Sequence, residues 1–253
     1  MMIPQHILTP EVTIAVFFFL YLVSDSLIAF KSALLTCYGL FILTILKMLY
    51  KDARPYWIDG QISATECFFD FSGPSYQMFL LSFFYNYLII MYCMKYTERP
   101  KKVLGRVLLL LVFLFAAVDF FSGLYTGQVY IYSNIAGGIY GLIFLVIAMN
   151  FDLEIHKMCE KTGFVLASSR RNKFYLLFVS MALFAVSLMY YTSERDSWTM
   201  PQSWIINASI GQLNCRVALI EHANNRLGLD QSFMYTSIIF FPCGMVFGTS
   251  YSL

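Results

Sequence analysis

The chain has 253 residues, of which 59% are hydrophobic, 18% aromatic and only 13% charged, with a formal net charge of +2. Soluble domains carry roughly 25% charged residues, and so much apolar surface cannot be buried in one soluble core, so lipid must form part of the solvent. This composition excludes a secreted disulfide scaffold and a disordered tail. The small net charge excludes a nucleic-acid binder.

Apolar runs of about 20 residues predict membrane spans. Six such spans are expected, at 11–30, 33–50, 75–95, 103–121, 135–150 and 173–191. A shorter run at 233–248 contains Pro242 and Gly244 and predicts either a seventh span or a re-entrant hairpin. The runs are continuous rather than alternating, which favours helices over a β-barrel. The expected fold class is therefore all-α, a polytopic membrane bundle of six to seven transmembrane helices.

The basic residues predict the orientation of this bundle. A turn near Lys31 would separate the first two spans, and the loops 95–106 and 151–173 would lie on the same side as that turn. This side carries 11 of the 17 Lys and Arg residues, so it is expected to face the cytosol, or the matrix of a mitochondrion. The loops 51–74 and 122–134 would face the lumen or the outside.

Three regions are expected along the chain. Residues 1–192 would form a six-helix membrane domain, residues 193–232 an extension, and residues 233–253 the short C-terminal apolar segment. Within the extension, apolar residues recur at helical spacing over 203–226, which predicts an amphipathic helix. Such a helix would lie on the membrane or dock on a partner subunit.

The first motif (47–57) lies at the lumenal end of the second span. Lys47, six further residues, and then Arg54 and Pro55 resemble the first signature of the type 2 phosphatidic acid phosphatase superfamily, which includes glucose-6-phosphatase and the lipid phosphate phosphatases. The resemblance implies that Lys47 and Arg54 bind phosphate oxygens. A fixed guanidinium fork beside a Lys charge suits that role.

The second motif (73–77) resembles the family's Pro-Ser-Gly-His signature, but only its first half is kept. Ser75 matches the family, whereas Tyr76 replaces the Gly whose N–H approaches the phosphate and Gln77 replaces the His that protonates the leaving oxygen. A glutamine cannot donate that proton as a general acid.

The third motif (122–137) begins with Ser122 and has lost its catalytic groups. Without gaps, Gly123 stands at the family's phosphate-binding Arg, Val129 at the nucleophilic His and Ser133 at the Asp that orients it. A one-residue gap would place Gln128 or Tyr130 at the nucleophile position, and neither is a His. The catalytic positions are therefore degenerate, and no catalytic residue is expected.

The resemblance, taken with these losses, predicts a pseudophosphatase with a phosphatidic acid phosphatase type 2-like core and a vestigial anion site at Lys47, Arg54 and Ser75. Lys47 and Arg54 would hold an anionic lipid headgroup or pair with a carboxylate of the chain. Asp119, near the lumenal end of the fourth span, is the expected partner because an ionisable residue in a span is usually paired. The other carboxylates expected on that side are Asp52, Asp59, Glu66 and Asp70.

The expected function is that of a structural or lipid-binding accessory subunit of a larger membrane complex. Its partners would be membrane lipids and other subunits, with no nucleic acid. A divergent phosphatase of lipid or sugar phosphates and a transporter-like protein are the alternatives. Six scattered Cys and three His show no metal-ligand spacing, so neither metal nor cofactor is expected. The family resides by default in the endoplasmic reticulum or another endomembrane, and the mitochondrial inner membrane is the alternative.

Overall fold

The computed structural model describes residues 16, 26–62, 68–95, 99–159, 170–211 and 227–251, which form helices joined by loops and contain no strand. The prediction of an all-α chain is confirmed for these residues. Their helices are α3 (Ser26–Tyr50), α4 (Pro55–Ile58), α5 (Tyr76–Leu80), the π-helix η1 (Leu81–Tyr85), α6 (Asn86–Lys95), α7 (Arg99–Tyr125), α8 (Ile131–Asn150), α9 (Asp152–Cys159), α10 (Arg170–Ser197), α11 (Gln202–Gly211), α13 (Leu227–Met234), the 3-10 helix η3 (Tyr235–Phe240) and α14 (Phe241–Tyr251).

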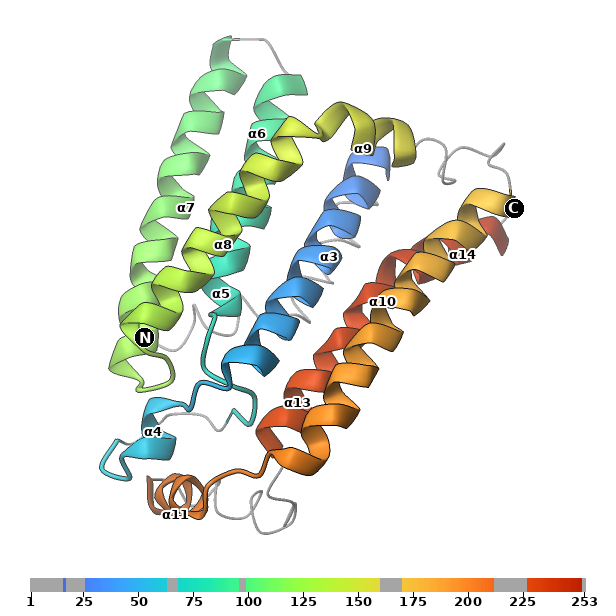
Figure 1. The fold of residues 1–253 in the computed structure, drawn as a ribbon. Helices are drawn as coiled ribbons and strands as arrows, with labels where there is room; N and C mark the ends of the chain where they lie inside the picture. Colours follow the sequence, from blue (N-terminus) through green and yellow to red (C-terminus); the bar gives the residue numbers. More distant parts are fainter. Residues whose placement is uncertain are drawn as a thin grey trace.

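Four of the described helical segments are long and apolar enough to cross a membrane, which indicates a membrane protein. They are Leu27–Ile58, Val103–Tyr125, Ile131–Asn150 and Phe174–Ser197. The first is 67% buried, whereas the second and fourth are only 17% buried, so α3 is central and the faces of α7 and α10 are left to lipid. Figure 1 shows the long helices side by side.

The predicted turn near Lys31 is wrong, because Ser26–Tyr50 is one uninterrupted helix. The Lys31 ammonium is buried and lies 2.7 Å from Oδ1 of Asp152 on α9. The hydroxyl of Tyr87 on α6 donates to the same carboxylate oxygen at 3.2 Å. The sequence shows Lys31 without a partner and so predicts a turn there, but a lysine that is paired with a carboxylate can be buried inside a helix bundle. Most of the predicted span 11–30 lies outside the described residues.

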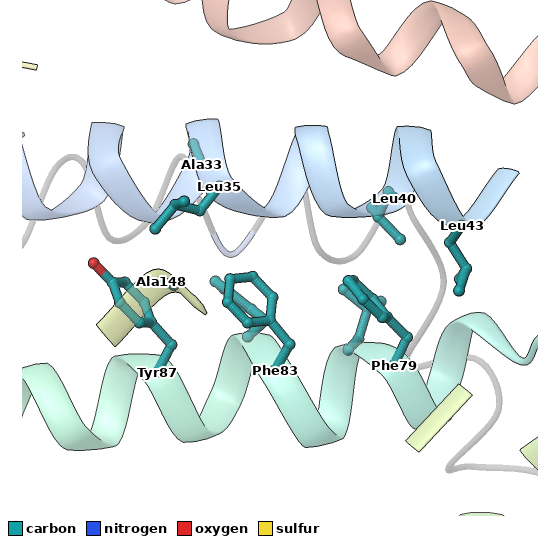
Figure 2. Packing of buried hydrophobic residues seen from close by; sticks show 10 residues of the cluster. Ala33, Leu35, Leu40, Leu43, Phe79, Phe83, Tyr87 and Ala148 are labelled. Carbon is teal, nitrogen blue, oxygen red and sulfur yellow. The ribbon is translucent and has the colours of Figure 1, made fainter. Parts of the chain in front are cut away.

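The core forms where α3 meets the helical rod made by α5, η1 and α6. Phe79, Phe83 and Tyr87 recur every four residues, so their rings stack along one face of the rod. Figure 2 shows these rings opposite the aliphatic side chains of α3, which are Ala33, Leu35, Leu40 and Leu43. The predicted span 75–95 corresponds to this rod, whose apolar part, Tyr76–Met91, is shorter than the four candidate spans.

The C-terminal apolar segment does not turn back on itself. The helices α13, η3 and α14 follow one another along 227–251, with helical backbone at both junctions. They run beside α10 and contact α3 (Figure 1). A re-entrant hairpin at 233–248 is therefore wrong.

The predicted amphipathic helix 203–226 is described only in part. α11 covers Gln202–Gly211 and packs on α4, and residues 212–226 lie outside the described residues. The Asn207 side-chain amide donates to the Ile58 carbonyl at 2.6 Å, which fixes α11 across the end of α4. Figure 1 shows both helices at the end of the bundle where α3 finishes. This end also carries the three motifs.

Candidate functional site

The first motif is shaped by the exit of the chain from α3. Lys47 lies in the last turn of α3, and the helix ends at Tyr50. Lys51 follows in the left-handed region with a φ of 51°, a strained conformation for a residue with a side chain. Its ammonium forms an ion pair with Glu194 on α10, which holds the turn. Arg54 is then the N-cap of α4, which begins at a proline that suits the first helical position.

The second and third motifs are joined through their backbones. Ser75 is the N-cap of α5, and its backbone N–H donates to the Ser133 carbonyl at 3.0 Å. Gly137 on α8 lies directly against the Ser75 backbone, so that a Cβ atom there would be only 3.0 Å from the Ser75 nitrogen. This approach requires glycine.

The third motif also contacts the first. The Arg54 guanidinium donates from Nη1 to the Gln128 carbonyl at 3.1 Å, and the Gln128 backbone N–H donates to the Gly123 carbonyl at 3.1 Å. Asp70, 16 residues further along the chain, and Gln128, 74 residues further along, therefore both contact Arg54 at one end of the bundle.

The anion between the two cations is the carboxylate of Asp70. Its Oδ2 lies 2.7 Å from Lys47 Nζ, and its Oδ1 lies 2.5 Å from Arg54 Nη2. Arg54 Nε donates to the Asp70 carbonyl at 2.8 Å, and Lys47 Nζ donates to the Phe71 carbonyl at 2.9 Å. Lys47, Arg54 and Asp70 are only 1%, 5% and 4% exposed. The cluster is a buried, hydrogen-bonded ion triad.

The prediction that Asp119 pairs with Lys47 or Arg54 is wrong. Asp119 on α7 is 4% exposed, yet the part of the chain that the structure describes contains no ion pair of its carboxylate. Ser122, one turn later, is also buried, and its hydroxyl has no hydrogen-bond partner among the described residues. Asp119 is fixed within a rigid helix, whereas Asp70 lies on a loop that can bring its carboxylate between both cations.

The positions at which the motifs differ from the family signatures carry uncharged groups, and one of them, Tyr76, contacts the triad directly. The Tyr76 ring lies under the Lys47 ammonium, 3.7 Å from Nζ to the ring centroid, which is a cation–π contact. The Gln77 Oε1 accepts a hydrogen bond from the Ser75 hydroxyl at 3.2 Å. A Cβ atom at Gly123 would lie 2.7 Å from Val129 Cγ2, so any side chain there would require Val129 to shift.

The described part of the site contains no histidine. Ser133 contacts Ser72 through their hydroxyl oxygens at 3.4 Å, where the family has an orienting Asp. His156 lies on α9, at the opposite end of the bundle, and His6 and His222 lie outside the described residues. Among the residues described, no three His, Cys, Asp or Glu side chains are grouped so that they could hold a metal ion.

No protein-family model, curated protein or solved structure matches this chain.

Asp70 is one of several carboxylates that the sequence places on this side, and its pairing is not predicted. One signal marks it in retrospect: it lies within the run Phe68-Phe69-Asp70-Phe71, and a carboxylate among three aromatic residues is expected to be buried and paired. Asp119 is the partner that the sequence favours, because an ionisable residue in a span is usually paired.

The triad predicts a loss of stability in acid. Burial alone would raise the pKa of Asp70, but the Arg54 and Lys47 cations outweigh it and lower the pKa to about 2, from an ordinary value of 3.8. The folded state therefore binds fewer protons at Asp70 than the unfolded state does, so the stabilisation is complete above about pH 4 and declines as pH falls towards 2. Thermal unfolding of the purified chain between pH 6 and pH 2 should show this decline.

Other carboxylates also contribute to acid unfolding, so the comparison is made with the Asp70→Asn variant. Its unfolding temperature should fall less steeply over the same pH range. Parallel curves for the two proteins would contradict the role given to the Asp70 charge.

Proposed function

We propose that the chain is a catalytically inactive relative of the type 2 phosphatidic acid phosphatases and acts as a structural subunit of a larger membrane assembly. The observation that carries this proposal is the position of Asp70, whose two carboxylate oxygens occupy the two cations that the family uses for phosphate. An internal anion at that position leaves no free cation for a substrate phosphoryl group.

The contacts among the three motifs support the relation to the family. Arg54 of the first motif donates to the Gln128 carbonyl of the third, and the Tyr76 ring of the second motif lies under the Lys47 ammonium of the first. Ser75 of the second motif donates its backbone N–H to the Ser133 carbonyl of the third. A chance Lys-x6-Arg-Pro sequence would give no reason for the other two motifs to gather at the same place.

The losses at the catalytic positions support inactivity. The family mechanism needs a nucleophile, an acid and a group that orients the nucleophile. Val129, Gln77 and Ser133 occupy those positions, and a missing nucleophile alone removes several orders of magnitude of rate. The chain keeps a central helix and wide apolar outer faces. Such faces could contact other subunits, which supports a structural role.

Six or seven crossings of the membrane belong to the same proposal. The four candidate spans would be joined by the rod of α5, η1 and α6 and by the segment 227–251 beside α10. The seventh would be the span 11–30 expected from the sequence, most of which lies outside the described residues. The endoplasmic reticulum or another endomembrane is the proposed location, with the mitochondrial inner membrane as the alternative. Imaging of a tagged chain against markers of both membranes would distinguish them.

Phosphate release by the purified chain tests inactivity. We expect no release above the detergent blank from phosphatidic acid, sphingosine phosphate or glucose 6-phosphate. The matched control is Arg54→Ala, which removes a cation of the triad. Turnover by the unaltered chain that Arg54→Ala abolishes would contradict inactivity and favour a divergent phosphatase.

A second measurement tests the subunit role. Mild-detergent purification from native membranes should recover partner proteins together with the chain, and recovery of the isolated chain alone would contradict this role.

A further inference from the structure

We propose that Asp70 is a tethered anion that closes an oxyanion site, and that removal of its carboxylate opens this site to inorganic phosphate. The inference rests on the proposed function, since it concerns the same two cations, and it adds the identity of the group that excludes the ligand. The site it describes is a latent one, filled by the chain itself.

The geometry of the triad resembles that of a bound oxyanion. Lys47 and Arg54 contact different oxygens of Asp70, at 2.7 Å and 2.5 Å, rather than sharing one oxygen. Two oxygens of a tetrahedral oxyanion such as phosphate can accept hydrogen bonds from a Lys and an Arg in the same arrangement as the two carboxylate oxygens. The carboxylate therefore satisfies the pair in the way that a phosphate edge would.

The charge of the triad favours a stronger anion than a carboxylate. Lys47 and Arg54 bring two positive charges, and among the described residues their ion pairs are with Asp70, which brings one negative charge. A buried excess of positive charge is unfavourable. Phosphate near neutral pH carries between one and two negative charges, so in place of the carboxylate it would neutralise the pair more completely.

The Asp70 carboxylate, rather than an anion from solution, occupies the site because its loop is anchored. The Tyr56 hydroxyl donates to the Phe68 carbonyl at 2.6 Å and accepts from the Phe68 N–H at 3.0 Å. The Phe68 ring in turn covers the Arg54 guanidinium, 4.9 Å from Cζ to the ring centroid. A carboxylate held this way has a far higher effective concentration than a free anion in solution.

The test measures thermal unfolding of the full-length chain in detergent, with Asp70 replaced by alanine and with inorganic phosphate as the probe. Sodium chloride keeps the ionic strength constant. We expect the unaltered chain to unfold at the same temperature with and without phosphate. We expect Asp70→Ala to unfold at a lower temperature and to recover by about 3 °C or more as phosphate rises to saturation.

Three controls make the result specific. Asp70→Ala combined with Arg54→Gln should show no recovery, because one of the two cations is gone. Asp70→Asn, which keeps the side-chain volume, should recover less than Asp70→Ala, and it replaces the alanine variant as the test if that variant does not fold. Acetate should raise the unfolding temperature of Asp70→Ala by less than phosphate does.

Two outcomes would overturn the inference. They are an unfolding temperature of the Asp70 variants that does not respond to phosphate, and a better recovery with acetate than with phosphate. Neither outcome depends on turnover, so each is distinct from a failure of the proposed function, which would appear as phosphate release by the unaltered chain.

Discussion

Asp70→Asn is expected to lower the free energy of unfolding by about 3–5 kcal/mol, the cost of removing one partner from a buried ion pair. The change leaves the Lys47 and Arg54 cations together in a buried site without the anion between them. The asparagine oxygen can still accept one hydrogen bond but carries no charge. Chemical or thermal unfolding of the purified chain measures the difference.

The matched control is Asp119→Asn. Asp119 is as deeply buried as Asp70, but the described residues form no ion pair with it, so the substitution removes an acidic group that no described cation offsets. A neutral amide is less costly to bury than a carboxylate. We expect Asp119→Asn to change stability by less than about 0.5 kcal/mol or to increase it. A larger loss at Asp119 than at Asp70 would contradict the assignment of the triad.

Gly137→Ala is expected to destabilise the chain by about 1–3 kcal/mol through overpacking. The new methyl group would meet the backbone of Ser75, 3.0 Å from its nitrogen and closer still to its carbonyl oxygen. Backbone atoms cannot move aside as a flexible side chain can, so α8 would be pushed away from α5. The hydrogen bond from the Ser75 N–H to the Ser133 carbonyl would weaken at the same time.

The neighbouring glycine provides the control for this prediction. A Cβ atom at Gly138 would have its nearest neighbour, the Ser82 hydroxyl oxygen, at 3.6 Å, which is an ordinary contact. Because alanine is a better helix former than glycine, Gly138→Ala should leave stability unchanged or raise it by up to about 1 kcal/mol. Equal losses at the two positions would indicate that the helix tolerates neither and that the close approach at Ser75 is not the cause.

The sequence predicts the long apolar helices well because their length and composition are local properties. The predicted spans 103–121, 135–150 and 173–191 lie within α7, α8 and α10, and 33–50 lies within α3. The spacing of Lys47 and Arg54 likewise indicates two cations at the end of one span, where they are observed.

Pairings between distant residues could not be predicted in this way. Lys31 and Asp152 are far apart in the sequence, and nothing local to Lys31 shows that a carboxylate will meet it inside the bundle. The choice between Asp70 and Asp119 also depends on the path of a loop. Hydropathy places a helix along the membrane normal but does not place a loop residue between two side chains.

The central helix α3 has a consequence for the order in which the chain is made. Lys31 is separated by 121 residues from Asp152, and Lys51 is separated by 143 residues from Glu194. During synthesis, α3 therefore enters the membrane long before either partner leaves the ribosome, and Lys31 needs water, lipid headgroups or another protein near it until α9 arrives. Nascent chains that stop before Asp152 should therefore expose an unpaired lysine, a feature by which membrane quality control can distinguish them from the complete bundle.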